Sequence, residues 1–412
     1  MTRSSFVLTA FSALILSACT TPIESVEPDI GSLHQSAIVI DAHADIVLPE
    51  TSPLYLGADG RSKTSAEKLR AGQVDAVVMS VAAGPKPRTS DGDVAAESEA
   101  DAKLSEIQSL VDATEGLSFA TTSEQIRAHQ ATGQISILLG FQNAQALNGD
   151  LAKLDELYGA GVRVFGLTHM GHNDYADSSR PMFDGETGTY EVTEEHGGLS
   201  ELGRAAVQRI DDLGGIIDVS QMSKAATLEA IMLAQTPVIA SHSNIKTLSD
   251  VTRNLSDEEI DRIGATGGVI HIAAFSAYLV DLSDSILVEQ IRGVRREAGL
   301  PESYSYPYEL YWELEKDEDK IAFLTKMRAL VGRENVSRMV DHIDYVVERI
   351  GIDHVGIGTD FNHGGGIIGF TEANSAANVT SELIARGYSA EDVNKIWGEN
   401  FLRVLDSANA RN

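Results

Sequence analysis

The sequence predicts an α/β fold, a (β/α)8 TIM-like barrel with an inserted lid-like segment before its last strand. Eight short runs of β-branched and other apolar residues alternate with amphipathic stretches along the 412 residues. Near-continuous apolar runs are typical of strands buried on both faces, as in parallel sheets. Repeated strand–helix units imply a parallel sheet, and eight such units favour a sheet closed into a barrel.

The expected elements follow one another along the chain. The predicted strands are residues 37–45, 74–81, 135–141, 162–169, 215–221, 237–243, 268–275 and 354–361. The clearest predicted helices are residues 65–71, 150–160, 199–213, 223–234, 256–265 and 334–350. Two of these helices are expected to begin with a capping box, in which a hydroxyl and a carboxylate satisfy backbone N–H groups: Thr64 with Glu67, and Ser256 with Glu259.

One connection is too long for an ordinary barrel loop. Residues 276–333 precede the last predicted helix and strand, whereas most connections have about 4–6 residues. The segment contains SYSYPYELYWELEKDEDK, which is rich in tyrosine and acidic residues. We therefore expect a lid-like insertion within a single barrel domain that spans residues 35–408.

The charge balance excludes one class of partner. The chain has 61 acidic and 32 basic residues, a formal net charge of −29, while its 43% of hydrophobic residues is ordinary for a globular protein. A surface this acidic repels phosphate, so we expect no nucleic-acid partner.

The N-terminus has the pattern of a processing segment. Residues 1–18 combine the basic Arg3 with a short apolar run at 6–16, too short to span a membrane. The run ends in Leu-Ser-Ala-Cys, which resembles a bacterial lipobox and predicts that Cys19 is lipidated, with residues 19–34 as lipidated Cys and tether. A plain signal peptide with a chance cysteine is the alternative.

This N-terminal pattern also predicts a location. Acyl chains on Cys19 would make the membrane a partner through a lipid anchor. Thr20, rather than Asp, follows the cysteine. Under the common bacterial sorting rule this predicts a cell-envelope protein at the outer membrane, facing the periplasm.

Titratable residues gather at the ends of the predicted strands. The first strand ends in His43 and Asp45, the fourth in His169, the sixth in His242 and the eighth in Asp360. In a barrel these ends converge on the carboxyl face, where active sites are built. Imidazole and carboxylate together suit zinc or a similar divalent ion. The pattern therefore predicts a metal-dependent hydrolase.

The remaining histidines and motifs carry less information. We expect structural or solvated roles for His34, His129 and His354. His271 and His342 are expected to pack in the core. The loops at the carboxyl face contain three histidines that could border the substrate, namely His172, His196 and His363. The chain lacks GxSxG, Walker and HExxH motifs, and its single cysteine excludes an intrachain disulfide.

With these residues in view, the sequence resembles the membrane (renal) dipeptidase family of zinc peptidases, from about residue 37 to residue 405. The motifs that carry the resemblance are IDAHAD at 40–45, GLTHMGHNDYADS at 166–178, HGGLSELGR at 196–204, PVIASHS at 237–243, TRNLSDEEI at 252–260, HVGIGTDF at 354–361 and GENFLRVL at 398–405. The resemblance implies a (β/α)8 barrel with two zinc ions that hydrolyses dipeptides, including some with a C-terminal D-residue.

The resemblance also implies ligands for the two metal ions and one catalytic role. His43 and Asp45 would bind the first ion, and His242 would bind the second. Asp360 would lie by the first ion and contact the substrate's amino group or the attacking water.

The remaining implied roles concern substrate binding. His169 would hydrogen-bond the carbonyl oxygen as it becomes an oxyanion. Arg253 would hold the free carboxylate of the dipeptide, for which a guanidinium fork is suited.

Two positions depart from the family pattern. A metal-bridging Glu aligns with Gln142, and a second-metal His aligns with Gln221. Both changes remove a strong ligand from the same ion, because an amide oxygen binds weakly and without charge. We therefore expect one firmly held zinc ion and a weak or empty second site.

The leading hypothesis is a metal-dependent dipeptidase that acts on L,L- and L,D-dipeptides with an altered second-metal site. One alternative is a catalytically weak or inactive dipeptide-binding pseudoenzyme, since a fold does not fix a function. Another is an amide or lactone hydrolase of different specificity. Metal-dependent turnover separates the first two. The resemblance also leaves a homodimer open, because family members are often dimers.

Overall fold

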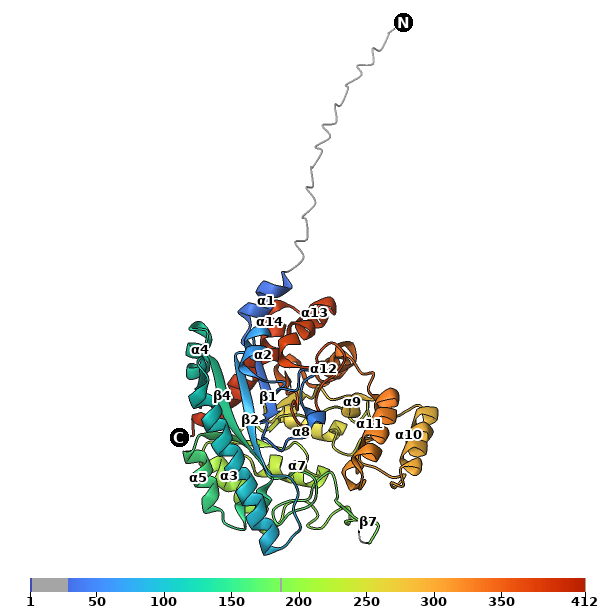
Figure 1. Cartoon of the computed structure of the whole chain (residues 1–412). Helices are drawn as coiled ribbons and strands as arrows, with labels where there is room; N and C mark the ends of the chain where they lie inside the picture. The colour runs from blue at the N-terminus through green and yellow to red at the C-terminus, as the bar shows by residue number, and fades with distance from the viewer. Residues whose placement is uncertain (2–28, 186, 412) are drawn as a thin grey trace.

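Eight parallel strands form the centre of the protein, as the sequence predicts (Figure 1). The structure is a computed structural model that describes residue 1, residues 29–185 and residues 187–411. The barrel strands lie in the order in which they follow along the chain: β1 (Ile40–Asp45), β2 (Ala76–Ala82), β4 (Ile135–Gln142), β5 (Val162–Gly166), β8 (Ile216–Asp218), β9 (Ile239–Ala240), β10 (Val269–Ile272) and β11 (Val355–Ile357).

Backbone hydrogen bonds join the two ends of this sheet. The amide of Asp45 donates to the carbonyl oxygen of Phe361 over 3.0 Å, and the amide of Asp360 donates to the carbonyl oxygen of His43 over 3.0 Å. Ala44 and Phe361 form a parallel bridge at the same place. The end of β1 therefore lies beside the segment after β11, and the barrel is nearly closed.

All six predicted helices are present. They are α2 (Ala66–Ala71), α5 (Ala152–Gly159), α6 (Glu201–Asp212), α7 (Lys224–Leu233), α8 (Asp257–Ala265) and α12 (Val336–Ile350). Further helices and strands lie outside the prediction: α1 (Ile30–Ser36), α3 (Ser90–Ala113), α4 (Ser123–Ala131), α13 (Ala377–Ala385), α14 (Ala390–Asn394), α15 (Asn400–Asn409), β3 (Leu117–Phe119), β6 (Phe183–Asp184) and β7 (Thr189–Tyr190).

One of the two capping boxes is correct and the other is wrong. The amide and hydroxyl of Ser256 both donate to the Glu259 carboxylate, over 2.8 and 2.7 Å, at the start of α8. At α2 the cap residue is Ser65, which makes no side-chain cap bond. The expected partners are engaged elsewhere: Thr64 accepts a hydrogen bond from Asn362, and Glu67 pairs with Arg61. Tertiary contacts have replaced the local ones.

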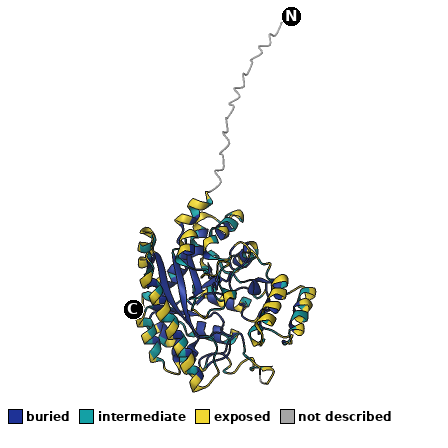
Figure 2. Ribbon diagram, in the orientation of Figure 1, coloured by how far each residue is buried: buried dark blue, intermediate teal, exposed yellow. Residues whose placement is uncertain are grey.

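The strands separate two apolar layers. Along each strand, side chains point alternately inwards and outwards. The inward side chains, such as Ile40 and Leu138, form a cluster inside the barrel with Phe401 of α15. The outward side chains, such as Val77 and Ile217, pack against the surrounding helices. Figure 2 shows the strands buried along their length while the helices expose their outer faces. This double burial explains why the strands read as continuous apolar runs.

The segment 276–333 is a helical insertion, with α9 (Ser276–Leu279), α10 (Ser285–Glu297), η3 (Tyr311–Glu313) and α11 (Asp317–Val331). It has its own apolar cluster, which includes Tyr278, Tyr306, Phe323 and Met327. In Figure 1, α10 and α11 lie at the side of the barrel away from α4 and α5.

The folded part begins earlier than the expected boundary at residue 35. Helix α1 starts at Ile30, and its His34 is buried, with Nδ1 2.7 Å from the hydroxyl of Thr380 and Nε2 3.0 Å from the carbonyl of Gly72. The end of the expected tether is therefore part of the folded body. Residues 2–18 of the predicted signal peptide and Cys19 lie outside the described residues. Within the described ranges, no helix combines the length and the apolar character needed to cross a membrane.

Candidate metal centre and active site

A β-bulge directs the first pair of predicted ligands into the barrel. Ile40 and Ala42 belong to the interior cluster, whereas Ala44 belongs to the layer under the helices. The register between β1 and β2 shifts between Asp41 and Ala44. An extra residue in a strand reverses the alternation of its side chains. His43 and Asp45 therefore face the interior of the barrel at its carboxyl end.

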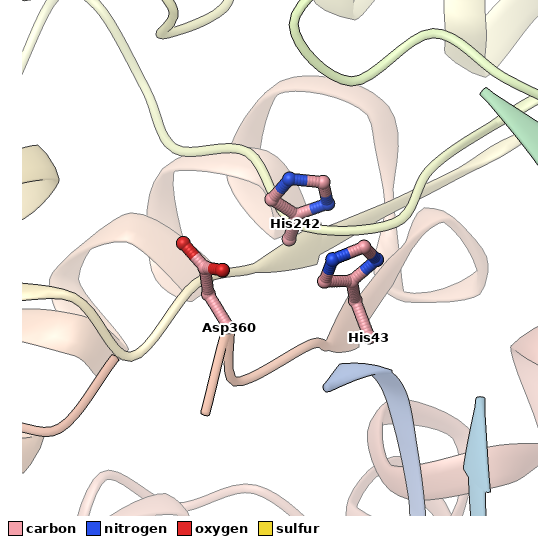
Figure 3. A group of neighbouring side chains, drawn as sticks. All are labelled: His43, His242 and Asp360. Atoms are coloured by element: carbon pink, nitrogen blue, oxygen red, sulfur yellow. The ribbon is translucent and has the colours of Figure 1, made fainter. Parts of the chain in front are cut away.

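Two groups of potential metal ligands meet at this end. The ligand atoms of His43, His242 and Asp360 lie within 4.8 Å of one another (Figure 3). A second group, with the same limit on its separations, consists of Asp45, Asp360 and His363. Asp360 belongs to both groups, so the five side chains form one continuous centre.

The structure thus brings together residues that the sequence analysis treated separately. His242 lies with His43, although the resemblance assigns these residues to different ions. His363 was expected only to border the substrate, yet its Nδ1 is 3.3 Å from Oδ2 of Asp45. Its position three residues after Asp360, in the same loop, was a signal that the sequence offered.

The two buried carboxylates lack donors. Asp45 is 4% exposed, and apart from the contact with His363 its oxygens have no hydrogen-bond partner among the described residues. Burial raises the pKa of Asp45, but His363, together with Lys103 and His43, outweighs this effect and holds the pKa well below its usual range. For Asp360, burial raises the pKa and His363 opposes the rise. Buried anionic oxygens without donors are a natural place for a cation.

The nearby imidazole of His242 is held in a form that suits a metal. Its Nδ1 lies 2.8 Å from the hydroxyl of Ser241, which donates to Asp218 over 2.5 Å. Asp218 also accepts hydrogen bonds from the amides of Ser220 and Ser241. The Ser241 hydroxyl proton is used by Asp218, so His242 Nδ1 carries the proton and Nε2 keeps a lone pair, which faces Nε2 of Gln221 at 3.3 Å. Burial lowers the pKa of His242 well below its usual value, which favours this neutral form.

Both groups combine imidazole with carboxylate, ligands that zinc accepts. The expected second-metal residues differ. Gln142 Nε2 has no partner among the described residues. The Gln221 amide oxygen, its only ligating atom, already accepts a hydrogen bond from Arg180 over 3.2 Å.

The predicted substrate-binding residues are buried beside this centre with free donors. Nη1 of Arg253 donates to the carbonyl oxygen of His242 over 2.6 Å, while Nε and Nη2 have no partner among the described residues. The guanidinium carbon lies 4.2 Å from the centre of the Tyr278 ring. Nδ1 of His169 also has no partner, and its ring stacks on His363 at 5.2 Å. Burial lowers the pKa of His169 well below its usual value.

A cavity of about 780 Å³ opens beside the centre. It extends from the metal-ligand side to the insertion. His169, Gln221, Asp360 and His363 line one part of it, and the insertion lines another with Tyr278, Tyr306, Tyr308, Tyr311 and Trp312. The volume lies within the range of small-molecule sites. Arg253 is not among the lining residues, but Tyr278, on which it stacks, is.

Two residues of the site have left-handed backbones. The φ angles of Gln221 and Asp360 are 67° and 57°. Such conformations cost about 1–3 kcal/mol each for residues other than glycine, and they gather at functional sites. The carbonyl oxygen of Gln221 accepts hydrogen bonds from the Ser178 hydroxyl and from the amide and hydroxyl of Ser179, which hold the turn.

Sequence reasoning missed Arg180, which is 5% exposed and lines the cavity. It lies in the loop between β5 and β6, and no spacing rule singles out an arginine in a loop. Tyr278 and Tyr306 were missed because the insertion was read only as a lid.

The chain belongs to the membrane dipeptidase family (peptidase family M19), whose profile matches residues 28–412. Members of this family are metal-dependent, typically with zinc, and membership supports a hydrolase of the dipeptidase class. The expected family and the expected fold are therefore confirmed.

Individual relatives agree with this assignment. The crystal structure of the probable dipeptidase PvdM from Pseudomonas aeruginosa is 33% identical, with a TM-score of 0.81 over 93% of this chain and 98% of that one. Dipeptidase verJ from Clonostachys rogersoniana is 25% identical over 84% of this chain and 75% of that protein. The chain spans about half the length of other curated fungal dipeptidases that it matches.

More distant structures share the fold. A metallo peptidase from Rhodobacter sphaeroides, liganded with a phosphinate mimic of L-Ala-D-Ala, is 20% identical with a TM-score of 0.69 over 90% of this chain and 99% of that one.

Removal of the Asp45 charge tests the centre. Asp45→Ala is expected to weaken zinc binding by at least about 100-fold, since changes even outside the ligand shell cost 10–100-fold. Equilibrium dialysis with elemental analysis measures this. The control is Asp75→Asn, which changes a partly buried carboxylate that accepts from the Val39 amide away from the site, and this variant should retain zinc. A full equivalent of zinc on folded Asp45→Ala would contradict the assignment.

Proposed function

We propose that this protein is a metal-dependent dipeptidase that works with one zinc ion. The observation that carries the proposal is the buried group of His43, Asp45 and Asp360, in which the Asp45 carboxylate has no partner among the described residues other than His363, beside a cavity of substrate size. When bound there, a divalent ion supplies Lewis acidity and lowers the pKa of water towards neutrality.

The protein's own residues would then position the peptide. Among the potential metal ligands, Asp360 is the carboxylate that lines the cavity, so one of its oxygens can accept a proton from the attacking water or a hydrogen bond from the substrate's ammonium group. His169 is neutral because burial lowers its pKa, and its ring can donate one N–H to the peptide carbonyl oxygen. A donor aimed at developing negative charge lowers the barrier most.

Arg253 supplies the specificity for a free carboxylate. Nε and Nη2 are neighbouring donors on one edge of the guanidinium, and both are unpartnered. The bond from Nη1 to the carbonyl of His242 and the stacking on Tyr278 fix the plane of the group. Two parallel donors in a fixed plane match the two oxygens of a carboxylate. A dipeptide presents such a group one residue beyond the scissile bond.

A second candidate function is dipeptide binding without turnover. The observation that favours it is the engagement of Gln221 by Arg180, which leaves the amide oxygen of this expected second-metal ligand unavailable for an ion. The two candidates share a substrate class and differ in catalysis.

We also propose that the mature protein is attached to the bacterial outer membrane, facing the periplasm, through lipid on Cys19. The support is the signal-like segment with its lipobox-like ending. The dipeptides would then come from the cell envelope, and both L,L- and L,D-forms are proposed substrates.

Hydrolysis of a panel of L,L- and L,D-dipeptides tests the proposed activity. We expect turnover by zinc-loaded protein, loss of that turnover with a chelator, and recovery when zinc is restored, because the ion supplies the activated water. Liquid chromatography of the released amino acids measures this. Folded, zinc-loaded protein that binds but never cleaves a dipeptide would leave the binding function instead.

Arg253→Ala tests carboxylate recognition. We expect the KM for dipeptides to rise roughly 10- to 100-fold, the range for loss of hydrogen bonds to a charged group, with a smaller change in kcat. C-terminally amidated dipeptides serve as a control, because they lack the carboxylate and should be affected little. Arg296→Ala, which removes an exposed arginine of α10 that pairs with Glu302, is the matched variant. An unchanged KM would contradict the assignment.

Metabolic labelling with palmitate tests the anchor. In a bacterial host we expect the full chain to incorporate label and to fractionate with membranes, whereas Cys19→Ala should do neither, because the thioether site is removed. Cys19→Ala that remains membrane-bound like the wild type would contradict the anchor.

A further inference from the structure

We propose that Arg180 is a fixed cation that replaces the second metal ion of this centre, so that the site is built for one ion and one guanidinium. The inference rests on the proposed function in one respect, namely that His43, Asp45 and Asp360 hold a metal ion. It concerns the residues at which the family pattern places a second ion: Gln142, Gln221 and His242.

A series of hydrogen bonds links the guanidinium of Arg180 to the imidazole of His242. Nη1 of Arg180 donates to Oε1 of Gln221 over 3.2 Å, and Nε2 of Gln221 lies 3.3 Å from Nε2 of His242. Arginine can only donate, so the amide oxygen must face it. The amide N–H then faces the unprotonated nitrogen of His242. The amide N–H of Gln221 therefore takes the lone pair of His242, so neither residue is left for a second ion, and the first ion is left to His43, Asp45 and Asp360.

Backbone hydrogen bonds hold Arg180 and Gln221 in position for the contact between their side chains. The Gln221 carbonyl oxygen accepts a hydrogen bond from the amide of Ser179 over 2.9 Å. Next to it, Ser178 and Met222 form an antiparallel β-bridge. The amide of Arg180 donates to the hydroxyl of Ser178, and its carbonyl accepts from Gly171 over 2.8 Å. Both Arg180 and Gln221 are therefore anchored through their main chains, and the left-handed turn at Gln221 is part of the same arrangement.

The burial and charge of Arg180 also fit this role. The side chain is 5% exposed and pairs with no carboxylate in the described part of the chain. Its other contacts are the Tyr306 ring, 4.5 Å from the guanidinium carbon, and the sulfur of Met170, 3.2 Å from Nη2. A buried cation without an ion pair is costly, so such a group is retained where its charge has a use. The neutral amides of Gln142 and Gln221 would not hold a dication beside it.

The guanidinium can do part of what the missing ion would do. Arg180 lines the cavity together with His169 and Asp360, and its Nε–H has no partner among the described residues. This donor is available to an electron-rich oxygen of a bound substrate. Hydrogen-bond donation from a fixed cation stabilises negative charge without requiring a second metal.

Zinc counts on three full-length proteins test the inference. They are the wild type, Gln142→Glu/Gln221→His, and the triple variant that adds Arg180→Met. After equilibrium dialysis we expect elemental analysis to give one additional zinc per chain in the triple variant relative to the double variant, and no additional zinc in the double variant relative to the wild type. As a matched control, Arg253→Met in the double background also removes a buried guanidinium stacked on a tyrosine, and it should add no ion.

Three results would overturn the inference: a second ion in the wild type or the double variant, no gain in the triple variant, or an equal gain with Arg253→Met. If the triple variant does not fold, the same test compares the zinc content of two other variants. These are Arg180→Met/Gln221→His and Gln221→His alone. The count does not depend on turnover. Failure of all the proteins to cleave dipeptides would therefore reject the proposed activity, while the difference in zinc content would still decide the role of Arg180.

Discussion

The seam that closes the barrel, between the end of β1 and the segment after β11, is the constraint on which the site depends. Reciprocal backbone hydrogen bonds tie His43 to Asp360 and Asp45 to Phe361. Asp41 strengthens the seam, since its carboxylate accepts from both the amide and the hydroxyl of Thr359. Residues more than 300 positions apart in the sequence are thus fixed side by side before any ligand is present. The left-handed turn at Asp360 is stable because this seam surrounds it.

Carboxylates and guanidinium groups are buried around the cavity without pairing with one another. In the described part of the chain the Asp45 carboxylate contacts only His363, while Arg180 and Arg253 keep donors without acceptors. No ion pair joins either arginine to a carboxylate among the residues that the structure describes. The free energy of folding therefore already includes the desolvation of these groups. A ligand set that places a cation beside Asp45 and oxygens beside the arginines gains their interactions without that desolvation. This is the preorganisation that catalytic sites require.

The barrel and half of the site were readable from the sequence, because both depend on local pattern. Strands buried on two faces read as apolar runs, and parallel strands bring their ends together, which placed His43, His242 and Asp360. Helix α3 was missed because its buried face consists largely of small residues such as Ala96 and Ala100, which give little apolar periodicity. Arg180 was missed for another reason. Its place is set by hydrogen bonds between two loops, and such contacts leave no spacing in the sequence.

The two arginines rest on rings from one segment, since Tyr278 and Tyr306 both belong to the insertion. The imidazole and carboxylate ligands come from strand ends and the loops that follow them. Selectivity and chemistry are thus carried by separable parts of the chain. A change in the length or sequence of residues 276–333 would shift both cationic groups together and leave the metal ligands where they are. Relatives that share this barrel could in this way acquire different substrates through changes confined to the segment that corresponds to residues 276–333.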